Sequence, residues 1–336
     1  EPDWARKVEQ RQGDSIRLCI ACNNCVERVD NGVAIGCLFN PRTGREAKLA
    51  KLPSKAPARK VLVVGGGPAG MQAALRAAEL GMQVTLVEAG SALGGQVPLA
   101  ASVPGRDAFA RVTDFLQRHL AASRVEIQTN KRLGSDPAEV SAYDGVIIAT
   151  GSDSDSLPAD AAIGVPRYRA EAVVKDPNLP MEQSAKAGKR ALVVIDDGMP
   201  AGPGAAEMLH ARGVEVHVVI NAAEMGLALP LNNRQMLMAR MLALPLHWHF
   251  HSTLASVSTS GEALIQTRGE GGKKIAGVDF VVHALPRTAS SALLDALSAQ
   301  GATVVAAGDC VAPRNLFSAV REGYDAADQM AGLLTA

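Results

Sequence analysis

The feature that most constrains the fold is a glycine-rich turn between two short apolar runs, within residues 60–88. The first run, KVLVV at residues 60–64, leads directly into Gly65-x-Gly67-x-x-Gly70. A helical apolar pattern follows, ends at Gly81, and is succeeded by a second run at residues 84–87. This order predicts a strand, a turn, a helix and a strand, the βαβ unit that binds dinucleotides when its turn carries three such glycines.

Each glycine has a different task in the predicted turn. Gly65 permits the tight bend, Gly67 lets the backbone approach a pyrophosphate, and Gly70 lets the helix pack close to the strand. The phosphate lies at a helix N-terminus in such units, because unpaired N–H groups and the positive end of the helix dipole favour an anion. Glu88 follows the second strand, where its carboxylate can accept a hydrogen bond from a ribose hydroxyl.

Four of the five cysteines lie close together, in the order C-x2-C-x2-C-x11-C. Three thiols at successive two-residue intervals can each reach a different iron of a cubane cluster, and the fourth returns after a short excursion. Structural zinc usually uses two separated pairs, so a zinc site is the alternative. A disulfide framework is disfavoured because the composition is typical of a cytosolic protein, and the cytosol keeps thiols reduced. The fifth cysteine, Cys310, has no second thiol near it in the sequence, so we interpret it as a small buried residue. The clustered cysteines are Cys19, Cys22, Cys25 and Cys37.

The composition excludes several classes of protein. Lys and Arg number 34 in the 336 residues, as do Asp and Glu, so no net charge attracts nucleic acid or an anionic membrane. No apolar run is long enough for a membrane span, and no signal-peptide pattern is present, so we expect a cytoplasmic location. Because the chain starts at Glu1 in a polar segment, we expect that it was cut from, or encoded downstream of, something larger.

A second βαβ pattern spans residues 190–220, but its turn lacks the glycine fingerprint. A strand at residues 191–195 and a helix at residues 205–212 flank a turn that starts with Asp196 and Asp197. Carboxylates offer only acceptors and add negative charge where phosphate oxygens need N–H donors. The strand end at Ile220-Asn221 has neither an arginine for a 2′-phosphate nor an acid for a ribose. The pattern therefore predicts a second nucleotide-type half that does not use NAD(P)H.

Two further patterns lie nearer the C-terminus. His247-x-His249-x-His251 places three imidazoles on one face if the segment is a strand; an exposed strand face is the simpler interpretation and a metal site the alternative. A strand at residues 303–307 leads to Gly308 and Asp309, ahead of a helix at about residues 316–334. An aspartate in that position can bind a chain of hydroxyls or cap the helix.

Several of these segments together resemble one known family. RLCIACNNC at residues 17–25, CLFNP at 37–41, GGGPAG at 65–70, Ala-Thr-Gly at 149–151 and Gly-Asp at 308–309 are similar to the C-terminal two thirds of the trimethylamine dehydrogenase and dienoyl-CoA reductase family. In that family an N-terminal (β/α)8 barrel holds FMN and the substrate, a 4Fe-4S cluster follows, and two nucleotide-type domains bind FAD or ADP. The resemblance covers nearly the whole chain but not the barrel, so it implies FMN on a missing or partner domain.

The resemblance implies an α/β fold with two nested Rossmann-like nucleotide-binding domains, preceded by a short iron–sulfur cluster loop segment. We expect the cluster segment and a linker at residues 1–57, an FAD- or ADP-binding domain at 58–152 and 288–336, and at 153–287 an inserted nucleotide-type domain that does not bind NAD(P)H. The cluster ligands would be the four clustered cysteines. The implied FAD or ADP contacts are Gly65, Gly67, Pro68, Ala69, Gly70, Glu88, Ala89, Gly95, Gln96, Thr150, Gly151, Gly308 and Asp309.

The two branches of this family differ in where electrons go. The reductase branch takes hydride from NADPH in the second half, which Asp196 and Asp197 argue against, although the LGGQ loop at residues 93–96 resembles that branch. The amine-dehydrogenase branch sends electrons to an electron-transfer flavoprotein, and residues 308–314 resemble it. We favour FAD over ADP in the first site. No catalytic residue is assigned, because substrate contacts of the family lie in the barrel.

We therefore interpret the chain as the electron-transfer part of an iron–sulfur flavoprotein dehydrogenase or demethylase for amines or N-methyl compounds. It would accept electrons from FMN in a barrel domain or subunit, pass them through a 4Fe-4S cluster to a protein acceptor, and form an oligomer. One alternative is an NAD(P)H-dependent dienoyl-CoA or enoate reductase module. The other is a zinc-stabilised adenine-nucleotide-binding scaffold without redox function.

Overall fold

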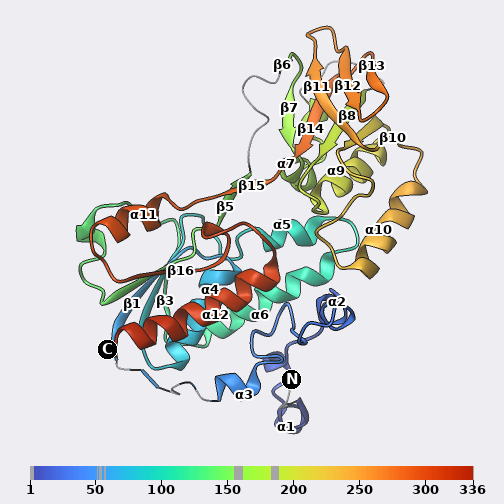
Figure 1. The fold of residues 1–336 in the computed structure, drawn as a ribbon. Helices are drawn as coiled ribbons and strands as arrows, with labels where there is room; N and C mark the ends of the chain where they lie inside the picture. Colours follow the sequence, from blue (N-terminus) through green and yellow to red (C-terminus); the bar gives the residue numbers. More distant parts are fainter. Residues whose placement is uncertain are drawn as a thin grey trace. The chain divides into compact units, whose positions relative to one another are not determined.

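The computed structural model describes residues 4–50, 52, 55–56, 58–154, 162–182 and 189–335. The chain divides into two compact units (Figure 1), and each contains a parallel five-stranded sheet. Unit 1 comprises Glu1–Pro98, Ala108–Asp153 and Thr288–Ala336, and unit 2 comprises Leu99–Asp107 and Ser154–Arg287. Residues 53, 54 and 57 of the expected linker lie outside the described part.

The sheet of unit 1 has the strand order β16-β4-β1-β2-β3, and all neighbouring strands are parallel. Val61, Leu62 and Val63 in β1 are all essentially inaccessible to solvent. A strand buried on both faces reads as a continuous apolar run, which is why these segments were recognisable in the sequence. The strands are β1 (Lys60–Val64), β2 (Gln83–Val87), β3 (Glu126–Gln128), β4 (Gly145–Ile148) and β16 (Val304–Ala306).

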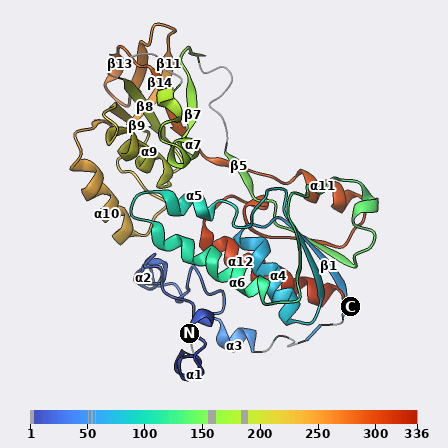
Figure 2. The ribbon, with the colours of Figure 1, turned by 180° about the vertical axis from the view of Figure 1, so that it is seen from behind.

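Helices cover both faces of this sheet. On one face α4 (Pro68–Glu79) packs against α6 (Ala110–Ala121) and α12 (Leu316–Leu333), as Figures 1 and 2 show. On the other face α11 (Ala292–Ala299) packs against apolar side chains of β1 and β4. The apolar positions at helical spacing in the α6 region are buried, which confirms their expected core role: Phe109, Val112, Phe115, Leu116 and Leu120.

The contact between α4 and α12 needs a glycine. A Cβ on Gly323 would lie 2.1 Å from the carbonyl oxygen of Ala69, so any side chain there would push the helices apart. The remaining elements of unit 1 are short. They are α1 (Trp4–Glu9), α2 (Asn24–Asp30), α3 (Glu46–Leu49) and the 3-10 turns Gly13–Ser15, Asp107–Phe109, Pro137–Glu139 and Gly308–Cys310; the Asp107–Phe109 turn begins in unit 2 and ends in unit 1.

The sheet of unit 2 has the order β10-β9-β8-β14-β7, again parallel. Helices α7 and α9 pack on one face, and a second sheet of order β13-β12-β11-β6 covers the other. The elements are β6 (Ala162–Ile163), β7 (Arg167–Arg169), α7 (Ala170–Lys175), α8 (Leu179–Glu182), β8 (Arg190–Ile195), α9 (Ala201–His210), β9 (Glu215–Ile220), α10 (Leu231–Leu242), β10 (His247–His249), β11 (Ser252–Val257), β12 (Ala263–Thr267), β13 (Gly271–Ile275) and β14 (Phe280–Ala284).

Three short elements, α5 (Val97–Ser102), β5 (Ser152–Ser154) and β15 (Arg287–Ala289), lie where the chain passes from one unit to the other, and β5 pairs with β15. The expected α/β class is confirmed. Helix α9 begins four residues before the expected start at residue 205, because Gly202 lets the first helical turn pack on Ile195, whose Cγ1 would lie 2.8 Å from an added Cβ. Among the described helices, none has the length and apolar content needed to cross a bilayer.

Candidate functional site

The residues expected to bind a nucleotide in unit 1 lie along one edge of its sheet. Strands β16, β4, β1 and β2 are neighbours and parallel, so their carboxyl ends meet at the same edge. Parallel sheets bind ligands outside the carboxyl ends of their strands. The expected residues come directly after these ends: Gly308 and Asp309 after β16, Thr150 and Gly151 after β4, Gly65, Gly67, Pro68, Ala69 and Gly70 after β1, and Glu88 and Ala89 after β2.

The three turn glycines differ in what surrounds them. Gly65 has a φ of +108°, and a Cβ there would lie 2.2 Å from the Ala149 carbonyl oxygen. A Cβ on Gly70 would lie 1.8 Å from the Gly65 carbonyl oxygen, so helix α4 starts as close to the turn as its backbone allows. The side of Gly67 is open, with the Gly95 Cα at 3.9 Å as the nearest atom, and a ligand can therefore approach the backbone at the start of α4.

A second loop packs over this turn. The N–H of Gly94 donates to the carbonyl oxygen of Gly66 at 2.8 Å, and Gly94 and Gly95 both adopt positive φ values. Gln96, the next residue, donates from its side-chain amide to the carbonyl oxygen of Ser152 at 3.4 Å. The loop at residues 93–96 is therefore held between the β1 turn and the segment after β4.

Glu88 has two partners that the sequence pattern did not indicate. Its carboxylate accepts hydrogen bonds from the N–H of Gly66 and from the N–H of Gly90, each at 2.6 Å. Each oxygen keeps a further lone pair, because an ionised carboxylate accepts about four hydrogen bonds. The side chain is thus fixed beside the turn, where it can still accept from a ribose hydroxyl.

Replacing Glu88 with alanine is expected to weaken nucleotide retention about 10- to 100-fold, because a hydrogen bond to a charged group contributes roughly 1.5–3 kcal/mol. Equilibrium dialysis with FAD and with ADP measures the effect. Glu79→Ala at the far end of α4 is the matched control, and thermal unfolding checks that both variants fold. Unchanged affinity in a folded Glu88→Ala protein would contradict the ribose contact. Glu88 would then only connect the loops of Gly66 and Gly90.

The other end of the edge carries Asp309 and Thr150. The Asp309 carboxylate accepts from the Ser152 hydroxyl and from the N–H of Arg314, both at 3.1 Å. The Thr150 hydroxyl donates to the Ser290 carbonyl oxygen at 2.8 Å. These contacts hold both side chains at the edge, and their expected contacts to FAD or ADP stay predictions.

The four clustered cysteines come together in unit 1 although eleven residues separate the third from the fourth. Burial raises the pKa of the Cys22 thiol, the N–H of Asn24 opposes this shift, and the nearby thiols of Cys37, Cys25 and Cys19 raise the pKa further. In the described chain no three of these sulfurs lie within 4.8 Å of one another. Thiolates on one tetrahedral zinc are about 3.8 Å apart, so the loop as it stands is wider than a mononuclear zinc shell.

The backbone of the cysteine loop is bent around the sulfurs. Ala21 and Asn23 adopt left-handed conformations with φ values of 52° and 56°, which are uncommon outside glycine. The N–H of Ala21 lies 3.4 Å from the Cys19 Sγ, and the N–H of Phe39 lies 3.4 Å from the Cys37 Sγ. Backbone N–H groups therefore lie beside two of the four sulfurs and could donate to them when they bind a metal.

Cationic side chains attach this loop to α6. The Arg17 guanidinium lies over the Phe115 ring at 4.7 Å and donates to the Asn40 side chain at 2.9 Å. Arg111 donates to the Cys19 carbonyl oxygen at 3.1 Å. These contacts tie the cysteine loop to the helix.

Unit 2 has a cavity of about 220 Å³ at the carboxyl ends of β8 and β9. Asp196, Asn221 and Glu224 are among its lining residues. Glu224 was missed in the sequence because it lies four residues beyond the end of β9, and its carboxylate pairs with Arg234 at 3.2 Å. Two acidic side chains therefore line the position where the second nucleotide-type half would hold a cofactor.

The neighbouring Asp197 faces its own turn and accepts from the N–H of Met199 at 2.9 Å. Burial raises the pKa of its carboxyl from the usual 3.8 to about 6, the Met199 N–H opposes this, and Glu171 adds to it. Because the folded pKa is the higher one, the contribution of Asp197 to stability is present below about pH 4 and is lost as the pH rises through 6.

Asp197→Asn is accordingly expected to stabilise the protein by about 3 kcal/mol at pH 7 and by less than about 1 kcal/mol at pH 4. Thermal or urea unfolding of both proteins between pH 4 and 7.5 measures this difference. Glu270→Gln, an exposed carboxylate in the same unit, is the control and should change neither value. A stability difference that does not depend on pH would contradict the pKa assigned to Asp197.

The prediction that three histidines share one face of a strand is only partly correct. Strand β10 ends at His249, and His251 follows with a φ of 50°, so the third imidazole is not on the strand. His217 of β9 takes its place, because His247 pairs with His217 in the parallel register. Burial lowers the pKa of His217, and it lowers that of His249 to about 4.

The parallel sheet of unit 1, with a glycine turn and a helix after β1, is a Rossmann-type nucleotide-binding fold. The chain belongs to the pyridine nucleotide-disulphide oxidoreductase family, which matches residues 59–323. It is therefore an oxidoreductase with an FAD/NAD-type fold.

The chain is also similar to individual known proteins and to solved structures. N,N-dimethylglycine/sarcosine dehydrogenase of Chromohalobacter salexigens is 30% identical over 97% of this chain and 52% of the relative, so the chain spans about half that protein. NADH oxidase of Thermoanaerobacter brockii is 37% identical over 46% of this chain and 24% of the relative. The structure of histamine dehydrogenase from Rhizobium sp. 4-9 has the same fold, with a TM-score of 0.85, 24% identity, and coverage of 98% of this chain and 53% of that one.

Proposed function

We propose that the chain is the electron-transfer part of an iron–sulfur flavoprotein that oxidises amines or N-methyl compounds. FAD, or ADP in its place, would bind at the glycine edge of unit 1, and Cys19, Cys22, Cys25 and Cys37 would hold a 4Fe-4S cluster. Electrons would come from FMN in a barrel domain or subunit and leave to a protein acceptor such as an electron-transfer flavoprotein. The observation that carries this proposal is the gathering of four thiols on a loop of the unit that also has the glycine edge.

The residues of the chain have distinct tasks in this proposal. The open backbone at Gly67 would receive a pyrophosphate, and Glu88 a ribose hydroxyl. The N–H groups of Ala21 and Phe39 would donate hydrogen bonds to the sulfurs of Cys19 and Cys37 when these hold the cluster. A bound 4Fe-4S cluster supplies one-electron transfer. The name of the Chromohalobacter salexigens relative supports an N-methylated amine as the substrate class.

Electron delivery to a protein tests the proposal. The protein, loaded with cluster and flavin, is reduced anaerobically with dithionite, freed of excess reductant, and mixed with an oxidised electron-transfer flavoprotein. We expect the acceptor to be reduced as the absorption of the protein returns to its oxidised form. A Cys37→Ser variant that still carries its flavin should deliver electrons at a small fraction of the wild-type rate. An acceptor that stays oxidised with the wild-type protein would refute the proposal.

An NAD(P)H-dependent reductase is the second candidate, and the cavity in unit 2 favours it. Glu224 lines the cavity beyond the end of β9, where such cofactors are usually contacted at the ribose, and it pairs with Arg234 of α10 at 3.2 Å. The similarity to the Thermoanaerobacter brockii NADH oxidase supports the same idea. The opposing observation is the second acidic side chain, Asp196, in the same cavity.

A further inference from the structure

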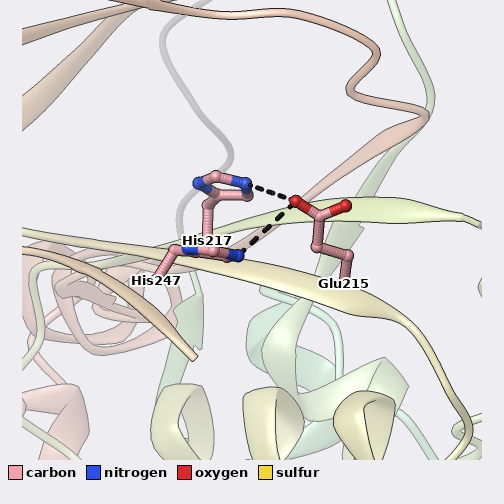
Figure 3. Close-up of side chains that lie close together, drawn as sticks. All are labelled: Glu215, His217 and His247. Atoms are coloured by element: carbon pink, nitrogen blue, oxygen red, sulfur yellow. Dashed lines mark hydrogen bonds and ion pairs between the residues drawn. The ribbon is translucent and has the colours of Figure 1, made fainter. Parts of the chain in front are cut away.

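Three side chains from two neighbouring strands of unit 2 converge on one point (Figure 3). Glu215 and His217 lie on β9, and His247 lies on β10, the edge strand of the sheet. The Oε1 atom of Glu215 is 3.2 Å from the Nε2 of His217 and 3.5 Å from the Nε2 of His247. One ligand atom from each residue lies within 4.8 Å of the other two. Two imidazoles and a carboxylate thus face a common centre.

These separations match those of ligands around one small ion. Zn–N and Zn–O bonds are about 2.0–2.1 Å long, which places tetrahedral ligands about 3.3 Å apart. The rings of His217 and His247 are 17° from parallel, with centroids 4.4 Å apart, so one ring must turn for both lone pairs to meet an ion. His247 can do so, because its side chain is 54% exposed and the torsion of an imidazole is broad.

Two of the three side chains, His217 and Glu215, are each held in place by a further hydrogen-bond partner. The other ring nitrogen of His217, Nδ1, lies 3.1 Å from the Nε2 of His249. The Arg190 guanidinium donates to the Oε2 of Glu215 at 2.8 Å, which leaves Oε1 for the common centre. Metal-binding histidines and carboxylates usually have such partners, which orient the ligand atom. His217 is also only 11% exposed, so its position is set by packing.

We propose that Glu215, His217 and His247 form a binding site for a divalent transition metal of the zinc class, with a water molecule as the fourth ligand. Nitrogen and carboxylate donors suit Zn²⁺ and its neighbours in the series, not Ca²⁺ or Mg²⁺. A bound ion links β10 to β9, so it stabilises the edge of this sheet. The site is independent of the cysteine loop and of the proposed electron-transfer role. The alternative is a hydrogen bond from His217 to Glu215 beside an ion pair between His247 and Glu215, with no metal.

Zinc counting in matched variants tests the site. The protein with its cysteines occupied by iron is dialysed against Zn²⁺, and bound zinc per chain is measured by mass spectrometry. Wild type should bind one more zinc than His247→Ala, and the affinity of the variant should fall by at least the roughly 100-fold that changes in outer partners can cost. His251→Asn is the control, because asparagine tolerates the left-handed backbone at that position. It should bind as wild type does.

Co²⁺ gives a second measurement that does not depend on counting. At a site with two histidines and a carboxylate it should show visible d–d bands without the near-ultraviolet charge-transfer band of thiolate ligands. Glu215→Gln should weaken these bands even if His247→Ala is poorly folded. Equal zinc in wild type and His247→Ala, or a thiolate band that accounts for all bound Co²⁺, would overturn the proposal and leave only the hydrogen-bonded group.

Discussion

Replacing Cys37 with serine is expected to remove the whole iron–sulfur centre, from about four irons per chain to nearly none. Cys37 comes from the far side of the loop, where the Asn24 side chain donates to the Gly36 carbonyl oxygen at 3.2 Å and ties this side to Cys22 and Cys25. A serine hydroxyl is not a thiolate, and a cubane that loses one of four ligands is exposed to solvent and oxygen. Iron and acid-labile sulfide analysis after anaerobic reconstitution, together with the visible spectrum, measures the loss.

Cys310→Ser is the matched control for this experiment. Cys310 is 1% exposed, as the sequence interpretation expected, and its thiol donates to the carbonyl oxygens of Ala307 and Ile148 at 3.2 and 3.3 Å. A serine can make the same hydrogen bonds, so iron and sulfide should stay at the wild-type level. A colourless wild-type protein with one zinc per chain would refute the cluster assignment and favour the zinc-stabilised scaffold.

NADH and NADPH are expected to leave the bound flavin oxidised for many seconds at millimolar concentration. The unit 2 cavity is lined by Asp196, which directly follows β8 and offers only acceptors where a pyrophosphate needs N–H donors. Its volume of about 220 Å³ is also below the roughly 300 Å³ at which small-molecule sites begin. Anaerobic stopped-flow absorption of the flavin measures the rate, and dithionite shows that the same flavin can be reduced.

A variant of Asp196 tests whether its carboxylate is the reason that NADH does not bind. Asp196→Asn removes a negative charge from the cavity with little change in shape, so NADH should bind more tightly than to wild type, as followed by fluorescence of the nicotinamide. Glu270→Gln removes an exposed charge of the same unit and should have no effect. Rapid bleaching of the wild-type flavin by NADH or NADPH would contradict this prediction and favour the NAD(P)H-dependent reductase.

Much of unit 1 was predictable because its constraints are local. Gly65 needs a positive φ, Gly70 needs the absence of a Cβ, and the apolar run of β1 reflects burial on both faces. Each of these properties depends on residues within one βαβ unit, so the order of residues in the chain is sufficient. The close spacing of Cys19, Cys22 and Cys25 is local in the same way.

The histidine group shows where sequence patterns were insufficient. Alternation within one strand suggested His251, but the chain leaves the strand after His249. The true neighbour of His247 is His217, thirty positions earlier, and only the parallel register of β9 and β10 brings them together. A pattern within one segment cannot give the register between two segments, because that depends on the packing of the whole sheet.

The sequence by itself therefore determined the α/β class, the glycine turn of unit 1 and the grouping of the first three thiols, because neighbouring residues carry these properties. Only the tertiary structure decided which strand ends meet at the nucleotide edge, that Glu88 is held by the N–H groups of Gly66 and Gly90, and that Glu224 reaches the unit 2 cavity. The physical reason is the same in each case. These contacts join segments far apart in the chain, and their partners are selected by strand order and close packing, not by local preference.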